Sequence, residues 1–274
     1  MAQVVPGLAA GSVHGFAAAL TSFVGRAAEV AEVAGLLDRY RLVTVTGPGG
    51  AGKTRLAAEV ARQVAGRFAD GVWLVELAGV QEPALLSAAV ATALGLQQAP
   101  GTSIAESLAA VLGRQQLLLV LDNCEHILAA AAEPCGSVLP IADEVRILAT
   151  SREPIGMAGE ARCRLPPLGL PRPDDPAEIP GSEAVILFVD RARRVDPHFR
   201  LSGESGPPVA RLVARLDGMP LAIELAAARV ETLGLAQLLA RRDGGLELSA
   251  AQRGGAAGVP PSGDLPRCVY PGRR

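Results

Sequence analysis

The sequence predicts an α/β fold, in which a parallel β-sheet is covered by helices on both faces and is followed by a small all-α unit. Apolar, β-branched runs alternate with stretches of helical periodicity as far as residue 165. Beyond that point the strand-like runs stop and only helical stretches follow. Because parallel strands require crossover connections, which are usually helices, the alternation favours parallel pairing.

The strand candidates are short and apolar. They cover residues 42–46, 71–77, 117–121, 146–150 and 162–165. Helical stretches before and between them cover residues 27–39, 55–61, 82–94 and 103–113. In the first of these stretches, Val30, Val33, Leu36 and Leu37 recur at the spacing of an amphipathic helix.

A segment rich in proline and acidic residues, 166–180, follows the last strand candidate and marks a domain boundary. Helices are expected after it at residues 183–195, 207–216, 220–230 and 235–241. Residues 1–19 and 246–274 show no period and little to bury, so we expect them to be disordered. The predicted organisation is an α/β domain over residues 20–165 and a linker with a helical lid domain over residues 166–245.

The composition argues against several classes of protein. A net charge of -2 and a pI of about 6.0 give no sign of the basic face that nucleic acids require. No apolar stretch approaches the roughly 18 residues that a membrane-spanning helix needs, and residues 1–25 lack the basic start of a signal peptide. The four cysteines show no C-x-x-C spacing, which argues against a metal site or a disulfide framework. We therefore expect a cytoplasmic protein with reduced thiols.

The strongest motif is a glycine-rich run between a predicted strand and a predicted helix. It comprises Gly47, Pro48, Gly49, Gly50, Ala51, Gly52, Lys53 and Thr54. The run matches G-x-x-x-x-G-K-[ST], a loop whose backbone N–H groups face a phosphate group. We expect Lys53, the only lysine of the chain, to contact the β- and γ-phosphates and the Thr54 hydroxyl to hold Mg²⁺. The alternative is a glycine-rich turn before an ordinary helix.

Two later strand candidates end in polar residues that suit the same site. Asp122 follows the strand at 117–121 and is expected to coordinate Mg²⁺, although an acid at this place is also typical of a helix N-cap. Arg152 follows the strand at 146–150 and could pair with a terminal phosphate, the alternative being a surface arginine.

These motifs occur in a fixed order together with two further ones. The ordered set covers residues 21–26 (Thr-Ser-Phe-Val-Gly-Arg), 47–54, 121–123, 150–152 and 217–224 (Asp-Gly-Met-Pro-Leu-Ala-Ile-Glu). Together they resemble the NB-ARC group of the STAND class of signal-transduction ATPases, as found in large bacterial transcriptional regulators of the LuxR and SARP types. The resemblance implies a P-loop NTPase domain of the AAA+/STAND kind with a helical lid.

The resemblance also implies roles for individual residues. Val24 and Arg26 would line an adenine pocket, chiefly through their backbones, and Pro220 of the lid would lie against the base. Asp122 would be the metal-associated acid and Arg152 the sensor of the γ-phosphate. The cofactors would be ATP or ADP with Mg²⁺. Such modules act as switches, in which ADP holds the module closed and exchange for ATP opens it and permits self-assembly.

Hydrolysis is less strongly indicated than binding. Asn123 stands where many relatives carry a second acid, and an amide cannot act as a general base. Glu125 is a candidate substitute, or else a charge favoured by a helix dipole. We therefore expect slow hydrolysis at most.

Other functions stay open. An active P-loop ATPase or small-molecule kinase would also carry the glycine loop, but no cationic or polar acceptor-binding lid stands out. Relatives continue beyond the lid and many read DNA with a further domain, whereas no DNA-binding domain is visible here, which is typical of a truncated module. A non-functional fragment is the remaining alternative.

Overall fold

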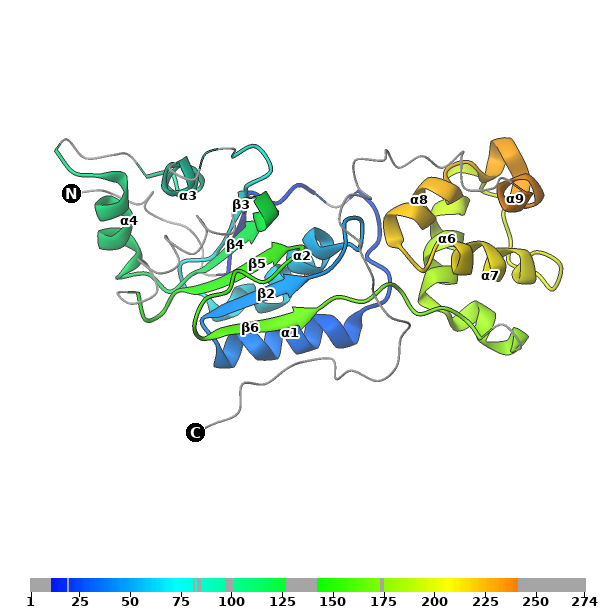
Figure 1. Ribbon diagram of the computed structural model, residues 1–274, viewed down its shortest axis with the longest axis horizontal. Helices are drawn as coiled ribbons and strands as arrows, with labels where there is room; N and C mark the ends of the chain where they lie inside the picture. Colours follow the sequence, from blue (N-terminus) through cyan, green and yellow to red (C-terminus); the bar gives the residue numbers. More distant parts are fainter. Residues whose placement is uncertain are drawn as a thin grey trace.

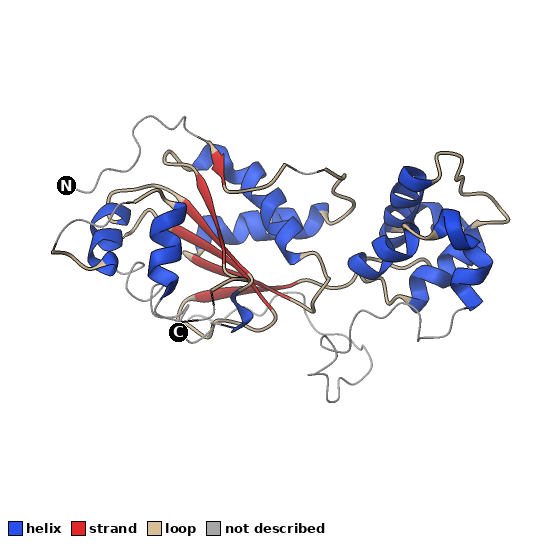
Figure 2. Cartoon of the chain, turned by 90° about the horizontal axis from the view of Figure 1, so that it is seen from above, coloured by secondary structure: helices blue, strands red, loops and turns tan. Residues whose placement is uncertain are grey.

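The computed structural model describes residues 11–18, 20–80, 82, 85–96, 101–126, 142–172 and 175–240. Within these ranges a six-stranded sheet carries helices on both faces, and a group of helices follows its last strand (Figures 1 and 2). The predicted fold class is therefore confirmed. In the described part of the chain, no helix has the length and apolar character needed to cross a membrane.

The sheet is parallel throughout. Its strands are β1 (Val13–His14), β2 (Leu42–Thr46), β3 (Val72–Glu76), β4 (Leu118–Asp122), β5 (Arg146–Ser151) and β6 (Glu160–Arg164). They lie in the order β1-β3-β4-β5-β2-β6, and every neighbouring pair runs in the same direction. The carboxyl ends of β2, β4 and β5 therefore meet at one edge, which is where the glycine-rich loop and the polar strand ends come together.

Helices cover the two faces of the sheet in pairs (Figure 2). They are α1 (Ala27–Arg39), α2 (Lys53–Val64), α3 (Leu86–Ala93) and α4 (Ile104–Leu112). Side chains of β4 alternate between the faces: Leu118 and Val120 pack in the core with α1 and α2, while Leu119 and Leu121 pack in the core with α3 and α4. Both faces are buried, which explains why this strand reads as a continuous apolar run rather than an alternating one.

The expectation of a disordered lead-in is wrong for part of residues 1–19. Val13 and His14 form β1 and pair with Val72 and Trp73 at the edge of the sheet. The His14 ring stacks on the Trp73 indole, with 4.1 Å between ring centroids. Without β1, β3 would be the edge of the sheet and would expose unpaired backbone N–H and C=O groups. These groups pair with residues 13–14, although the sequence around them lacks the alternation of apolar and polar residues that is typical of a strand.

The described part of the chain after β6 contains only helical elements. Its elements are η4 (Pro176–Gly181), α6 (Glu183–Val195), α7 (Gly206–Arg215), α8 (Pro220–Ala227) and α9 (Val230–Ala240). They enclose a separate apolar core, in which Phe188 meets Phe199 edge to face at 5.8 Å. The helix expected over 220–230 ends at Ala227, and α9 is kinked at Gly234, whose φ is 67°. The segment 246–274 lies outside the described residues.

Candidate functional site

The glycine-rich loop joins β2 to α2 and turns sharply at two glycines. Gly50 and Gly52 have φ angles of 77° and 87°, a left-handed conformation that side chains with a Cβ rarely adopt. A Cβ on Gly50 would also lie only 3.0 Å from the Cβ of Leu221 in the lid. Gly52, a fixed glycine of the motif, therefore meets a backbone requirement, and Gly50, at a variable position, meets both a backbone and a packing requirement.

Lys53 folds back over this loop. Its Nζ atom donates hydrogen bonds to the carbonyl oxygens of Gly47 at 2.9 Å and Pro48 at 3.1 Å, and the residue is only 9% exposed. Burial lowers the pKa of the amine, and the nearby carboxylates of Glu125 and Asp122 oppose this effect. The ammonium therefore lies at the loop, where a bound anion would stabilise its charged form.

Asp122 is the centre of a polar cluster beneath the loop. The Thr54 hydroxyl donates to both of its carboxylate oxygens, at 2.9 and 3.0 Å, and the Thr150 hydroxyl donates to Oδ1 at 2.5 Å. The backbone N–H of Asn123 donates to the Thr150 hydroxyl at 3.0 Å. Asn123 has a φ of 67°, so the chain turns away directly after the carboxylate.

The donor set fits a magnesium ion. Thr54 and Asp122 place a hydroxyl and a carboxylate within hydrogen-bonding distance of each other, and both are the hard oxygen ligands that Mg²⁺ prefers. Two protein ligands are typical of Mg²⁺ sites in which phosphate and water complete the shell.

Glu125 and Arg152 form an ion pair next to this cluster. The distance from Arg152 Nε to Glu125 Oε1 is 3.0 Å, and the two side chains are 47% and 17% exposed. Glu125 lies in a short 3₁₀ turn, η3 (Cys124–His126), and its second oxygen is buried without a hydrogen-bond partner. The pair therefore joins the two residues that the sequence suggested for γ-phosphate sensing and for water activation.

A narrow crevice lies beside the contact between the glycine loop and the helical unit. Its walls include Val24, Arg26, Gly52 and Pro220, so the residues expected at an adenine pocket do come together. The free volume is about 30 Å³, which is the share of about one water molecule in the liquid. The N–H of Leu221 donates to the Gly50 carbonyl at 3.2 Å, so α8 rests directly on the loop.

Arg26 occupies this crevice differently from the expectation. Its buried guanidinium donates to the carbonyl oxygens of Ala51 at 2.6 Å and Pro166 at 3.0 Å. Its backbone N–H donates to Glu183 Oε1 at 2.7 Å. The backbone N–H of Arg26, which was expected to contact the adenine base, therefore donates to the Glu183 carboxylate of the lid. The Arg26 side chain holds the glycine loop through its hydrogen bond to the Ala51 carbonyl.

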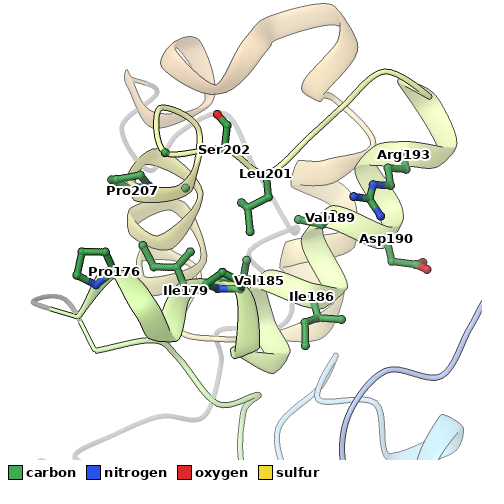
Figure 3. Close-up of a pocket in the computed structure, with 13 residues that line it drawn as sticks. Pro176, Ile179, Val185, Ile186, Val189, Asp190, Arg193, Leu201, Ser202 and Pro207 are labelled. Carbon is green, nitrogen blue, oxygen red and sulfur yellow. The ribbon is translucent and has the colours of Figure 1, made fainter.

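A second, larger hollow lies within the helical unit itself (Figure 3). It has a volume of about 770 Å³ and is formed by η4, α6, α7 and the chain between α6 and α7. Apolar side chains such as Ile179, Val189 and Leu201 line most of it, with Asp190 and Arg193 at one end. It contains no residue of the glycine loop or of β4.

The comparisons with known proteins agree with this geometry. The chain belongs to the AAA ATPase domain family, whose model matches residues 22–199. An uncharacterized protein of Mycobacterium tuberculosis is 44% identical over 237 residues, which are 86% of this chain and 58% of that protein. A second M. tuberculosis protein, named as an HTH-type transcriptional regulator, is 46% identical over 198 residues. That match covers 72% of this chain and 21% of the regulator.

A solved structure shares the fold at low sequence identity. The Walker-type ATPase of Pyrococcus abyssi matches with a TM-score of 0.53 and 14% identity, covering 80% of this chain and 71% of that chain. A STAND protein with a tetratricopeptide repeat sensor from Pyrococcus horikoshii has a TM-score of 0.48 and 16% identity, covering 80% and 31%. The relation to regulatory ATPase modules that the motifs indicated is confirmed by the family match and the regulator.

Several residues of the site were not found from the sequence. Thr150 stands in the Thr-Ser-Arg motif, but only strand pairing brings its hydroxyl to Asp122. Glu183 carries no motif signal, and Leu221 stands in the 217–224 motif but had no role assigned from the sequence. Both reach the site because the helical unit packs against the loop.

Proposed function

We propose that the chain is an ATP- and ADP-binding switch module of a bacterial transcriptional regulator, with slow hydrolysis. The observation that carries the proposal is the cluster beneath the glycine loop, where Thr54, Asp122 and Thr150 converge within 3.0 Å while α8 rests on the loop. The cluster supports a site for phosphate and metal, and the α8 contact supports a lid whose position depends on the nucleotide.

In this proposal each residue has a physical task. The backbone N–H groups of the loop and the N-terminus of α2 bind the phosphates, and Lys53 donates to the β- and γ-phosphates. Thr54 and Asp122 hold Mg²⁺, which supplies charge neutralisation between the phosphates. Arg152 pairs with the γ-phosphate when ATP is present, through N–H donors that its Nε contact with Glu125 leaves available.

The same ion pair supports slow hydrolysis. Asn123 cannot accept a proton from water, and the other candidate base, Glu125, is engaged by Arg152. The other oxygen of Glu125, Oε2, is buried and has no hydrogen-bond partner. This second oxygen favours a hydrolytic role for Glu125 and keeps an active ATPase as the second candidate function.

The helical unit is proposed to open when nucleotide exchanges. The crevice between the loop and the lid is narrow, with about 30 Å³ of free volume, so in this proposal nucleotide enters and leaves when α8 moves away from the loop. Pro220 begins α8 and lines this crevice, so its position follows that movement. The relationship to a transcriptional regulator suggests that opening is read out by assembly with other copies or domains.

Calorimetric titration with ADP and with a non-hydrolysable ATP analogue, both with Mg²⁺, tests the proposal. We expect binding of both ligands to the full chain and ATP turnover on the order of one per minute or slower, far below the usual enzyme range of about 1–10³ per second. Absence of binding would refute the switch. Turnover within that usual range, lost in Glu125→Gln, would support the active ATPase instead.

A further inference from the structure

A group of charged side chains crosses the boundary between the α/β part and the helical unit. Glu224 of α8 accepts hydrogen bonds at the same oxygen, Oε1, from Arg55 of α2 at 2.7 Å and from Arg191 of α6 at 2.9 Å. One carboxylate thus bridges the helix that begins in the glycine loop and the longest helix of the lid.

The two arginines also hold the segment that leads into α1. Arg55 donates to the carbonyl oxygens of Thr21 and Ser22, each at 3.1 Å. Arg191 donates to the Ser22 carbonyl at 2.9 Å and to the Ser22 hydroxyl at 3.0 Å. The bonds therefore join three separate parts of the chain: α2, the segment before α1, and the lid.

Asp190 completes the group on the lid side. It accepts from Ser22 Oγ at 2.9 Å and also pairs with Arg191. Burial alone would raise the pKa of this carboxyl, but the hydrogen bonds from Ser22 and Arg191 hold its pKa below the ordinary value. The carboxylate is therefore charged whenever the group is assembled at neutral pH.

Arg191 is the buried member of this group. Arg191 is 7% exposed, Glu224 29% and Arg55 38%. Removal of one partner from a buried pair leaves an uncompensated charge, which is strongly unfavourable. Loss of the Glu224 charge would leave Arg191 paired with Asp190 but would remove the direct charged bridge between α8 and α2.

The bridge lies at the entrance to the proposed nucleotide site. Arg55, Arg191 and Glu224 line the same crevice as Pro220, and Glu224 follows Pro220 by one helical turn on α8. Figure 1 shows α8 on the side of the helical unit that faces the α/β part. Fixing Glu224 therefore fixes the end of α8 that rests on the loop.

We propose that Glu224 is a latch residue, which holds the lid closed by bridging Arg55 and Arg191 and thereby sets the rate at which bound nucleotide leaves. This inference rests on the proposed nucleotide-binding function. The latch acts on the position of α8, and Glu224 itself needs no contact with the nucleotide.

Release of a fluorescent ADP analogue from the full chain tests the latch. In a stopped-flow chase with excess ADP, Glu224→Gln should release the analogue about tenfold faster, because the amide keeps the shape but loses the charge. Arg55→Gln should also speed release of the analogue. The Glu224→Gln/Arg55→Gln double variant should release it at about the rate of either single variant, because each of the three variants removes the same Arg55–Glu224 contact. Glu231→Gln, an exposed change on α9, is the matched control and should leave the rate unchanged.

Hydrogen exchange without nucleotide separates the latch from the proposed function. Glu224→Gln should speed the exchange of amides in residues 20–26 and at Leu221, while amides within α6 and α7 keep their protection. This result stands even if the wild-type chain fails to bind the analogue, which would refute the switch alone. Unchanged exchange in residues 20–26, or faster exchange throughout α6 and α7, would overturn the latch and make Glu224 a structural residue of the lid.

Discussion

Replacement of Lys53 by alanine is the most direct perturbation of the proposed phosphate site. An ammonium has three N–H donors, and two of them are occupied by the carbonyl oxygens of Gly47 and Pro48. One donor is therefore left for a phosphate oxygen. A hydrogen bond to a charged group contributes about 1.5–3 kcal/mol, which corresponds to a loss of roughly 10- to 150-fold in ADP affinity.

Isothermal titration with ADP and Mg²⁺ measures this loss. Lys53→Arg should not restore affinity, because a planar guanidinium cannot donate to two loop carbonyls and a phosphate from the same point. The thermal midpoint of each variant without ligand serves as the folding control. ADP affinity equal to that of the wild-type chain in a folded Lys53→Ala variant would refute the assignment of the loop.

Three further predictions concern the same site and the lid. Arg152→Ala should weaken binding of an ATP analogue more than binding of ADP, as measured by the ratio of the two dissociation constants, and an equal loss for both would make Arg152 structural. An amine-acylating reagent at about pH 8 should modify Lys53, since burial lowers the pKa of its amine, and ADP should protect it. Peptide mass spectrometry reads this out at the chain's only lysine, and equal labelling with and without ADP would contradict it. Phe188→Ala, in the core of the lid, should lower the free energy of unfolding by about 3–5 kcal/mol in a denaturant titration, against a negligible change for the exposed Arg211→Ala. A small loss at Phe188 would show that the lid core does not contribute to the measured transition.

The sequence was most informative where function depends on local backbone geometry. The glycine loop needs residues that adopt a positive φ, a lysine and a hydroxyl at fixed spacing, so its eight positions could be predicted from the chain alone. Asp122 and Arg152 could be predicted for a related reason. Asp122 ends a continuous apolar run and Arg152 follows a mostly apolar one. A buried parallel strand delivers the residue at its carboxyl end to the edge of the sheet where ligands bind in such folds.

Contacts between residues far apart in the sequence could not be predicted from the sequence pattern. The short strand at Val13 and His14 has no period of its own and exists because an edge of the sheet was available to it. The occupation of the Arg26 backbone by Glu183 likewise depends on how the helical unit docks.

The sequence by itself determined that a glycine-rich loop follows one strand, that polar residues end two others, and that a helical unit follows. Only the tertiary structure decided which of these groups meet. Asp122 reaches Thr54 because β5 places β4 and β2 at a fixed separation, and Glu224 reaches Arg55 across 169 residues because the lid folds back onto the loop. The spacing of residues within a motif depends on the local backbone, so the sequence reveals it. Contacts between distant charged residues depend on which helix and sheet faces pack together. A sequence pattern shows that a face is apolar, but it does not show which other face will cover it.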